Sequence, residues 1–297
     1  MRKIKKIMVM LFLTGGVLSY SPADSILDEI NGLLTITPKD PELYFQRGYY
    51  YYQREDFERA SADFITCVRL DPRDLVYRFY KAKTDFKSGK MRTAIDGFKT
   101  VIEMNPKYAE AFFFLGILYH QVNEKVNALQ AFDKAIDLNW NVAKYWAARA
   151  RFKKENGEIN EAVSDYQKAI MIEPDLAVAH YELAWINFEK HNIDSALEHA
   201  EKLVILEHNP LFYHTLACIY SEKNLRKAIE NEMRALSLEP SREYEKSLAG
   251  FRQGRSYSLQ MEETRKIRDE IMRKNEMEKR QRENIWNQII EKNKMLR

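Results

Sequence analysis

The chain has 297 residues, of which 45% are hydrophobic and 31% are charged, and its formal net charge is +3. This charge is uneven: residues 1–23 carry four basic and no acidic side chains, residues 24–240 carry 28 basic and 34 acidic, and residues 241–297 carry 15 basic and 10 acidic. Without its first 23 residues the chain is close to neutral. That balance argues against a general nucleic-acid-binding protein, which would present a strongly basic surface.

Residues 1–23 are typical of an export signal, with a basic head, an apolar stretch and small residues before a cleavage point. The head contains Arg2, Lys3, Lys5 and Lys6, the apolar stretch is residues 7–20, and Ser21 and Ala23 stand at the −3 and −1 positions. The 14-residue stretch is shorter than the ~20 residues that cross a bilayer, so an uncleaved anchor is the weaker alternative. No cysteine lies nearby to carry a lipid. We therefore expect an exported protein, most simply in a bacterial periplasm, with no membrane span in its mature chain.

The rest of the chain is organised around a 34-residue sequence motif, which is clearest at residues 109–142. Its first half carries Leu115 and Tyr119 four residues apart, and its second half carries Ala128 and Phe132 at the same spacing. Such spacings place side chains on one face of an α-helix. Each half is therefore predicted to be a helix of about a dozen residues, which needs a partner helix and neighbouring pairs to bury its apolar face.

Variants of this motif recur along the chain at a nearly constant spacing. We predict a signal peptide at 1–23, a capping helix equivalent to half a repeat at 24–40, and six repeats at 41–74, 75–108, 109–142, 143–176, 177–209 and 210–242. Residues 243–297 are predicted to be a degenerate capping repeat followed by a long charged helical tail. The alternatives for the tail are a solvated helix and an amphipathic segment that binds a partner or another copy of the chain.

The recurring residues follow the pattern W-x2-L-G-x2-Y in the first helix and A-x3-F-x2-A in the second, with a proline at the end of the motif. At 34-residue spacing, this pattern resembles the tetratricopeptide repeat. The resemblance implies an all-α fold, a right-handed superhelix (solenoid) of antiparallel helix pairs. The first helices of such a solenoid line a concave face that typically binds peptides or proteins. Arg47, Lys81 and Arg149 depart from the pattern at the leucine position, which leaves open how those helices pack.

The resemblance also implies which side chains line the concave groove, namely those at the second, fifth, ninth and twelfth positions of each first helix. The predicted lining comprises Phe45, Tyr49, Tyr52, Phe79, Lys83, Phe86, Phe113, Ile117, His120, Arg151, Lys154, Tyr181, Trp185 and Phe188. Aromatic residues flank a basic middle, which suits an extended peptide with apolar side chains and one carboxylate. The alternative is that several of these rings pack against the adjacent repeat. A Lys-x3-Asn clamp, used by one subfamily of these repeats for C-terminal carboxylates, is absent because Phe45 and Tyr49 stand at its positions.

Proline marks most corners between repeats, where it ends the second helix. These prolines are Pro38, Pro72, Pro106 and Pro174. The corner after residues 109–142 is an exception, because Trp140 stands at the proline position. Without the fixed φ of proline the corner is less constrained. We predict a local change of curvature at residues 138–142, with the Trp140 ring packed into the corner.

Motifs that support catalysis or cofactor binding are absent: the sequence has no nucleophile elbow, HExxH pair, phosphate-binding glycine loop or cysteine-based zinc spacing. Five of the six histidines lie in the fifth and sixth repeats, but no two are four residues apart. They are His180, His191, His199, His208 and His214. Cys67 and Cys218 lie more than four repeats apart, too far for a disulfide within a helical stack, and are predicted to be buried helix-contact residues. We expect no enzymatic activity, cofactor or metal.

These patterns together predict an exported, non-catalytic scaffold or adaptor that binds a peptide or protein segment in its groove, for example in envelope assembly. The alternative belongs to a different class. It is a structural oligomer or a membrane-surface protein that acts through the basic C-terminal helix.

Overall fold

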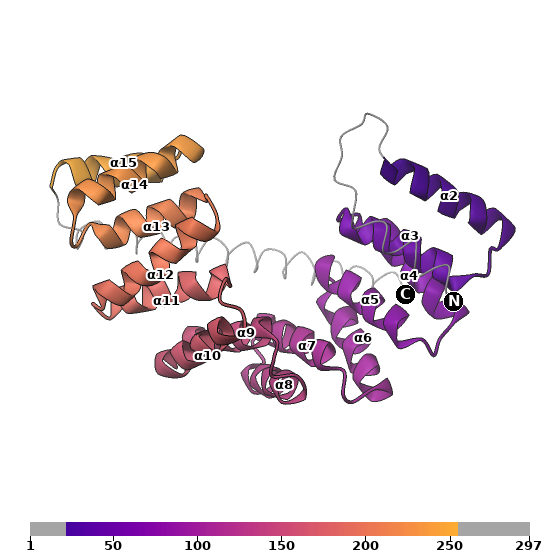
Figure 1. The fold of residues 1–297 in the computed structure, drawn as a ribbon. Coiled ribbons are helices and arrows are strands. Elements are labelled where there is room, and N and C mark those ends of the chain that lie inside the picture. Colours follow the sequence, from indigo (N-terminus) through magenta and orange to yellow (C-terminus); the bar gives the residue numbers. More distant parts are fainter. Residues whose placement is uncertain (1–21, 255–297) are drawn as a thin grey trace, which may run out of the picture. The chain divides into compact units, whose positions relative to one another are not determined.

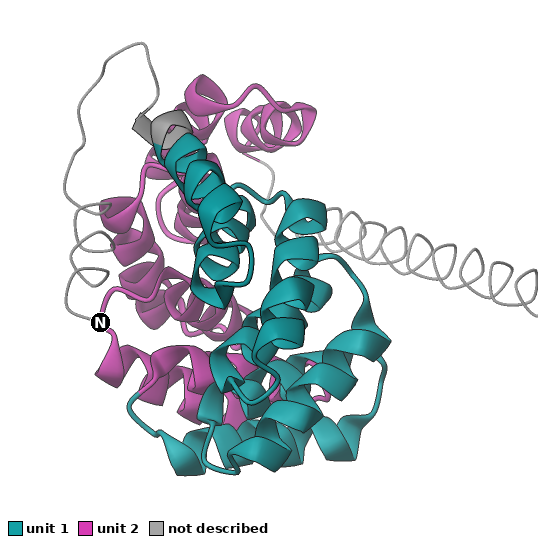
Figure 2. Cartoon of the chain, turned by 90° about the vertical axis from the view of Figure 1, so that its right-hand side faces the viewer, with its two compact units in different colours: residues 1–141 teal, residues 142–297 magenta. Residues whose placement is uncertain are grey.

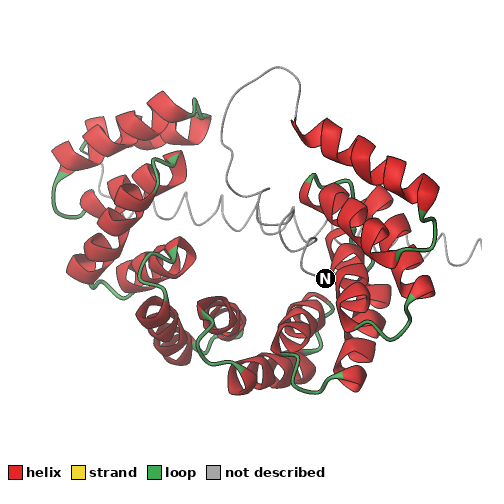
Figure 3. Ribbon diagram, turned by 45° about the vertical axis from the view of Figure 1, so that its right-hand side comes forward, coloured by secondary structure: helices red, strands yellow, loops and turns green. Residues whose placement is uncertain are grey.

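A computed structural model describes residues 22–254, and within this range the regular elements are all α-helices joined by loops (Figures 1 and 3). The all-α fold class is thus confirmed. None of the helices in this range is both long enough and apolar enough to cross a bilayer. Most of the predicted signal peptide and the charged tail after residue 254 lie outside the described residues, so both stay predictions.

The chain divides into two compact units, residues 1–141 (unit 1) and residues 142–297 (unit 2), coloured teal and magenta in Figure 2. The helices of unit 1 are α2 (Pro22–Ile36), α3 (Pro41–Gln53), α4 (Phe57–Leu70), α5 (Leu75–Lys87), α6 (Met91–Met104), α7 (Ala109–Gln121) and α8 (Lys125–Leu138). Those of unit 2 are α9 (Ala143–Glu155), α10 (Ile159–Ile172), α11 (Ala177–Glu189), α12 (Ile193–Leu206), α13 (Pro210–Tyr220), α14 (Leu225–Leu238) and α15 (Arg242–Arg252). Helix α2 includes Pro22 and Ala23, the last two residues of the predicted signal.

Each predicted repeat contains one pair of packed helices. The pairs are α3–α4, α5–α6 and α7–α8 in unit 1, and α9–α10, α11–α12 and α13–α14 in unit 2. The first alanine of the second-helix pattern is fully buried in all six pairs, at Ala60, Ala94, Ala128, Ala162, Ala196 and Ala228. A methyl side chain at these contacts allows the two helix axes to approach closely.

The turn inside a repeat places one residue in the left-handed backbone region. In the first five repeats this residue recurs every 34 positions, at Glu55, Gly89, Asn123, Gly157 and His191, with φ between 59° and 87°. At the first of these turns the amide of Asp56 donates to the carbonyl of Tyr51 at 3.0 Å, which satisfies an otherwise unpaired carbonyl at the end of α3. Glycine adopts this conformation freely, whereas Glu55 and His191 adopt it at some cost. The position in the repeat, rather than the residue type, therefore fixes the turn.

A single helix covers each end of the described chain. Ile30 and Leu34 of α2 are buried against Leu43 of α3. At the other end, Leu248 and Phe251 of α15 are buried, and Phe251 joins the core of the sixth repeat. Both ends therefore shield apolar surface that a repeat without a neighbour would expose to water.

The division between the units falls between Asn141 and Val142, inside the segment that lacks the corner proline. Trp140 is 66% exposed, so the expectation that its ring packs into the corner is wrong. The predicted change of curvature at residues 138–142 stays a prediction.

The basic residues at the leucine position all pair with buried aspartates. The pairs are Arg47 with Asp63 (2.7 Å), Lys81 with Asp85 (2.6 Å) and Arg149 with Asp165 (2.8 Å). In the first and third pairs the arginine lies on the first helix and the aspartate on the second, sixteen residues later, with two parallel hydrogen bonds. These departures from the repeat pattern therefore exchange an apolar contact between the two helices for a bidentate ion pair.

The two cysteines are free and buried, as predicted from their positions in the repeats. Burial raises the pKa of the Cys67 thiol to about 12. A protonated, inaccessible thiol is a poor nucleophile, so Cys67 is a packing residue at neutral pH.

Candidate partner-binding surface

The predicted groove residues lie on the first helices of the repeats, and we call this set the first-helix face. Its unit 1 part lies on α3, α5 and α7, and its unit 2 part lies on α9 and α11. On each helix these residues are three or four positions apart, which places them on one side of the helix.

A network of aromatic rings joins α3 to α5 in unit 1, with Tyr80 at its centre. The Tyr80 ring centroid lies 5.2 Å from that of Phe45, 5.5 Å from that of Tyr49 and 6.2 Å from that of Tyr52. All three contacts are edge-to-face, an arrangement that the ring quadrupoles favour. Sequence reasoning missed Tyr80 because consecutive helix residues point about 100° apart, and only its neighbour Phe79 occupies a predicted groove position.

Lys83 lies within this aromatic network. Its Nζ is 5.5–5.7 Å from the ring centroids of Tyr52, Phe79, Tyr80 and Phe114. A carboxylate oxygen of Glu110 lies 3.9 Å from the same nitrogen. Burial and nearby tyrosines raise the pKa of Tyr52 to about 12, so its hydroxyl remains neutral. Unit 1 thus holds a cation against ring faces, an interaction worth about 0.5–1 kcal/mol at accessible sites.

The structure separates the predicted lining into buried rings and accessible side chains. Phe79, Phe113 and Phe188 are at most 9% exposed, as the packing alternative predicts for part of the set. Phe45, Tyr49, Tyr52, Phe86, Ile117, His120, Tyr181 and Trp185 are half-buried. These half-buried side chains and the exposed Arg151 offer surface that a partner can cover without disturbing the repeat core. Their role in binding stays a prediction.

The basic residues of unit 2 differ in their surroundings. Lys154 Nζ donates to Glu182 Oε2 at 2.5 Å, whereas Arg151 is exposed on α9. On α11, Trp185 Nε1 is buried and has no hydrogen-bond partner among the described residues. A buried donor without an acceptor costs about 1–3 kcal/mol. The acidic partner of Lys154 was not predicted, because Glu182 stands outside the four groove positions.

The clustered histidines of unit 2 form pairs inside the repeats. The Nδ1 atoms of His180 and His199 are 3.1 Å apart, and His214 Nδ1 lies 2.9 and 3.0 Å from the two carboxylate oxygens of Glu232. Cys218 Sγ lies 3.5 Å from His214 Nε2. Within residues 22–254, no group of three or more histidine, cysteine, aspartate or glutamate side chains is arranged to hold a metal ion. The His214–Glu232 pair was not predicted, because Glu232 replaces the phenylalanine of the second-helix pattern.

Comparisons with known proteins agree with this repeat geometry. The sequence matches models of the tetratricopeptide repeat over residues 79–143 and over residues 41–74 and 143–176. Among relatives, the mitochondrial import receptor subunit TOM70 of Homo sapiens is 24% identical over 186 residues, covering 60% of this chain and 31% of the receptor. This chain therefore spans about a third of the length of that relative.

Two solved structures show the same arrangement of helices. A chain of the APC/C hetero-tetramer Cut9–Hcn1 superimposes with a TM-score of 0.64 and 16% identity, over 77% of this chain and 46% of its own. The pilF protein of Pseudomonas aeruginosa superimposes with a TM-score of 0.62 and 13% identity, over 76% of this chain and 98% of its own. At such identities the likeness shows the fold alone. The fold is an all-α tetratricopeptide solenoid, as predicted, and the matched residues 41–74 and 79–176 carry tetratricopeptide repeats.

Proposed function

We propose that this chain is an exported, non-catalytic scaffold that binds a peptide or protein segment on its first-helix face. The observation that carries the proposal is a cluster of half-buried rings in unit 1: Tyr52 and Tyr80 lie 5.7 and 5.5 Å from Lys83 Nζ, and Tyr49 contacts Tyr80. A few central residues, often Tyr, Trp or Arg, supply most of the binding energy in many protein interfaces. The repeat type supports this role, since tetratricopeptide repeats are protein-interaction modules and one relative is named as an import receptor subunit.

The surroundings of the basic residues refine the chemistry of the partner. Lys83 and Lys154 already face Glu110 and Glu182, so a carboxylate of a partner would compete with these side chains. Arg151 is exposed and can form a bidentate pair with a carboxylate. We therefore expect unit 1 to favour apolar side chains of a partner, and Arg151 of unit 2 to favour a carboxylate.

The proposal is tested by capture of partners from an envelope extract. A Tyr49→Ala, Trp185→Ala variant removes one accessible ring from each unit and is expected to lose most of the captured partner. Tyr50→Ala is a matched control, because Tyr50 neighbours Tyr49 on α3 but its ring contacts Tyr51 and Arg54 rather than the network around Tyr80. Equal capture by the double variant and the wild type would place binding elsewhere.

Export is a second part of the proposal and rests on the pattern of residues 1–23. Fractionation of cells that produce the full chain is expected to recover it in the periplasm. Sequencing of its mature N-terminus should then begin at Asp24. Recovery of the chain with Met1 intact in the membrane fraction would favour an uncleaved anchor instead.

A further inference from the structure

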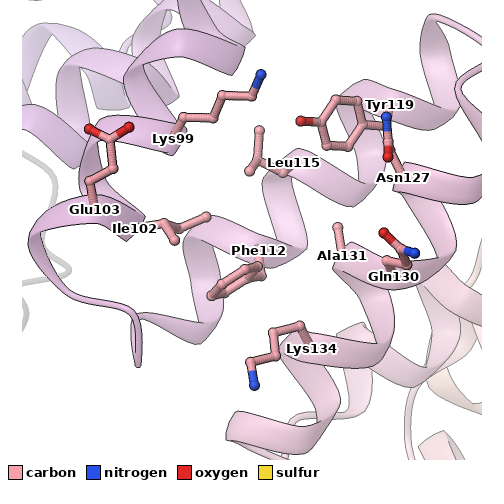
Figure 4. Close-up of a pocket in the computed structure, with 10 residues that line it drawn as sticks. All are labelled: Lys99, Ile102, Glu103, Phe112, Leu115, Tyr119, Asn127, Gln130, Ala131 and Lys134. Atoms are coloured by element: carbon pink, nitrogen blue, oxygen red, sulfur yellow. The ribbon is translucent and has the colours of Figure 1, made fainter.

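A hollow of about 540 Å³ opens on unit 1 between the second helices α6 and α8, over α7 (Figure 4). Its apolar floor is formed by Ile102, Phe112, Leu115 and Ala131, with the ring of Tyr119 beside them. These α7 residues are not those of the first-helix face, which uses Phe113, Ile117 and His120 on another side of the same helix. The hollow is therefore a surface distinct from the one in the proposed function.

At the hollow, repeat 109–142 lacks an ion pair that repeat 41–74 has at the equivalent positions. There Arg47 of α3 bonds Asp63 of α4 at 2.7 Å and also donates from Nη1 to Asn31 Oδ1 of α2 at 2.8 Å. One guanidinium thus bridges two successive second helices. In repeat 109–142 the residues at the positions of Arg47 and Asp63 are Leu115 and Ala131. Both are too short to span this gap, so an apolar floor is left open.

Lysines border this floor on two sides. Figure 4 shows Lys99 and Lys134 on opposite sides of Leu115 and Phe112. Among the residues that the structure describes, neither lysine forms an ion pair. Glu103 is the one acidic side chain among the lining residues, so the border carries an excess of positive charge.

We propose that this hollow docks a segment of a partner protein that presents a large apolar side chain between acidic residues. The apolar side chain would cover Leu115 and Phe112, where burial of apolar area supplies the affinity. Flanking carboxylates would face Lys99 and Lys134, where exposed charges contribute mainly to orientation and association rate. Such a segment complements both the basic border and the apolar centre of the hollow, whereas a basic or wholly polar segment would gain from neither feature.

The probe for this site is a synthetic dodecapeptide with one leucine among glutamates and aspartates, labelled for fluorescence anisotropy. Two further peptides replace the leucine by serine or the acidic residues by lysine. The full chain is expected to bind the acidic leucine peptide at least tenfold more tightly than either variant peptide. Absence of saturable binding, or equal binding of the serine peptide, would overturn the proposal.

A protein variant tests the location. Leu115→Arg with Ala131→Asp rebuilds the pair of repeat 41–74 and fills the hollow, so peptide affinity should fall at least tenfold while the circular dichroism spectrum is kept. Lys99→Glu with Lys134→Glu changes only exposed side chains and provides a second variant, which should also weaken binding at least tenfold at low salt. Tyr49→Ala is the control and should bind the peptide as the wild type does. Unchanged affinity in both site variants would show that the hollow is not the docking site.

Discussion

The same two repeat positions hold different chemistry in the two units. In unit 1 they hold phenylalanine pairs, such as Phe79 and Phe98, whose ring centroids are 5.7 Å apart. In the sixth repeat, in unit 2, they hold His214 and Glu232, with Glu232 fully buried. The packing geometry of the helix pair is kept while an apolar contact is exchanged for a charged one. A repeat thus fixes the shape of a contact more strictly than its polarity, and the two contacts should respond differently to mutation and to pH.

The largest effect is expected from Phe98→Ala in unit 1. Phe98 is fully buried between α5, α6 and α7, and its ring stacks on Phe114 with a centroid separation of 5.1 Å. Deletion of a buried phenylalanine side chain costs about 3–5 kcal/mol, because a cavity replaces the ring. Urea unfolding followed by amide hydrogen exchange of α5–α7 measures this loss. A cost below about 1 kcal/mol would mean that the repeat collapses around the vacancy, as a loosely packed core does.

A slightly smaller effect is expected from Glu232→Ala in unit 2. Removal of one partner of a buried ion pair costs about 3 kcal/mol, since His214 is left buried without its anion. The double change His214→Phe, Glu232→Phe recreates the unit 1 pair and should recover most of this loss. Hydrogen exchange of α13 and α14 in urea provides the measurement. If the phenylalanine pair is no more stable than the single variant, the two positions are not equivalent and the comparison between the units fails.

A third prediction concerns Gly116, which lies beside the phenylalanine of its own repeat. A Cβ added at Gly116 would lie 2.6 Å from the ring of Phe132, which is nearly fully buried and cannot move freely. Gly116→Ala should therefore destabilise unit 1 by about 1–2 kcal/mol, because overpacking outweighs the better helix propensity of alanine. Gly32→Ala in α2 is the matched control, since nothing lies within 4 Å of its added Cβ, and it should be neutral or stabilising. Equal midpoints of urea unfolding for the two variants would contradict this account.

Much of the fold follows from the sequence because the same residue pattern occurs in several repeats. The burial of Ala60 and its five equivalents follows directly from the recurring pattern. The arginine pairs were not foreseen, although a signal exists: Arg47 and Arg149 are each followed sixteen residues later by an aspartate, at Asp63 and Asp165. Two departures from the pattern that compensate each other can thus be recognised when the two helices of a repeat are compared.

The candidate surface was less predictable than the fold. Position in a first helix indicates which side a residue faces, but not whether its neighbours bury it. Phe79 and Phe86 both occupy groove positions, yet Phe79 is 2% exposed and Phe86 is half-buried. The difference arises from contacts with Tyr108 and Phe98, which lie outside the first-helix pattern. Such contacts depend on three helices at once and have no fixed spacing in the sequence.

The smallest expected effect is a pH dependence of stability that unit 2 shows and unit 1 lacks on either side of pH 6.5, the ordinary pKa of histidine. Burial and the neighbouring His180 lower the pKa of His199 below its ordinary 6.5. Its stabilising contribution is therefore present above about pH 6.5 and is lost as the pH falls through the lowered folded-state pKa. Protonation of His199 would place a charge in a largely buried site between α11 and α12, where its Nδ1 lies 3.1 Å from Nδ1 of His180.

The pH dependence of stability expected from His214 has the opposite sign. Burial lowers the pKa of His214, but Cys218 and the carboxylate of Glu232 outweigh burial and raise that pKa well above 6.5. Its contribution is therefore complete below about pH 6.5 and is lost as the pH rises through the raised folded-state pKa. Urea titrations at several pH values, each followed by a hydrogen-exchange pulse at one fixed pH, separate the two helix pairs. We expect α11–α12 to weaken on the acid side and α13–α14 on the alkaline side. His199→Gln should remove only the acid-side loss, and a loss that persists in this variant would assign the acid sensitivity to another group.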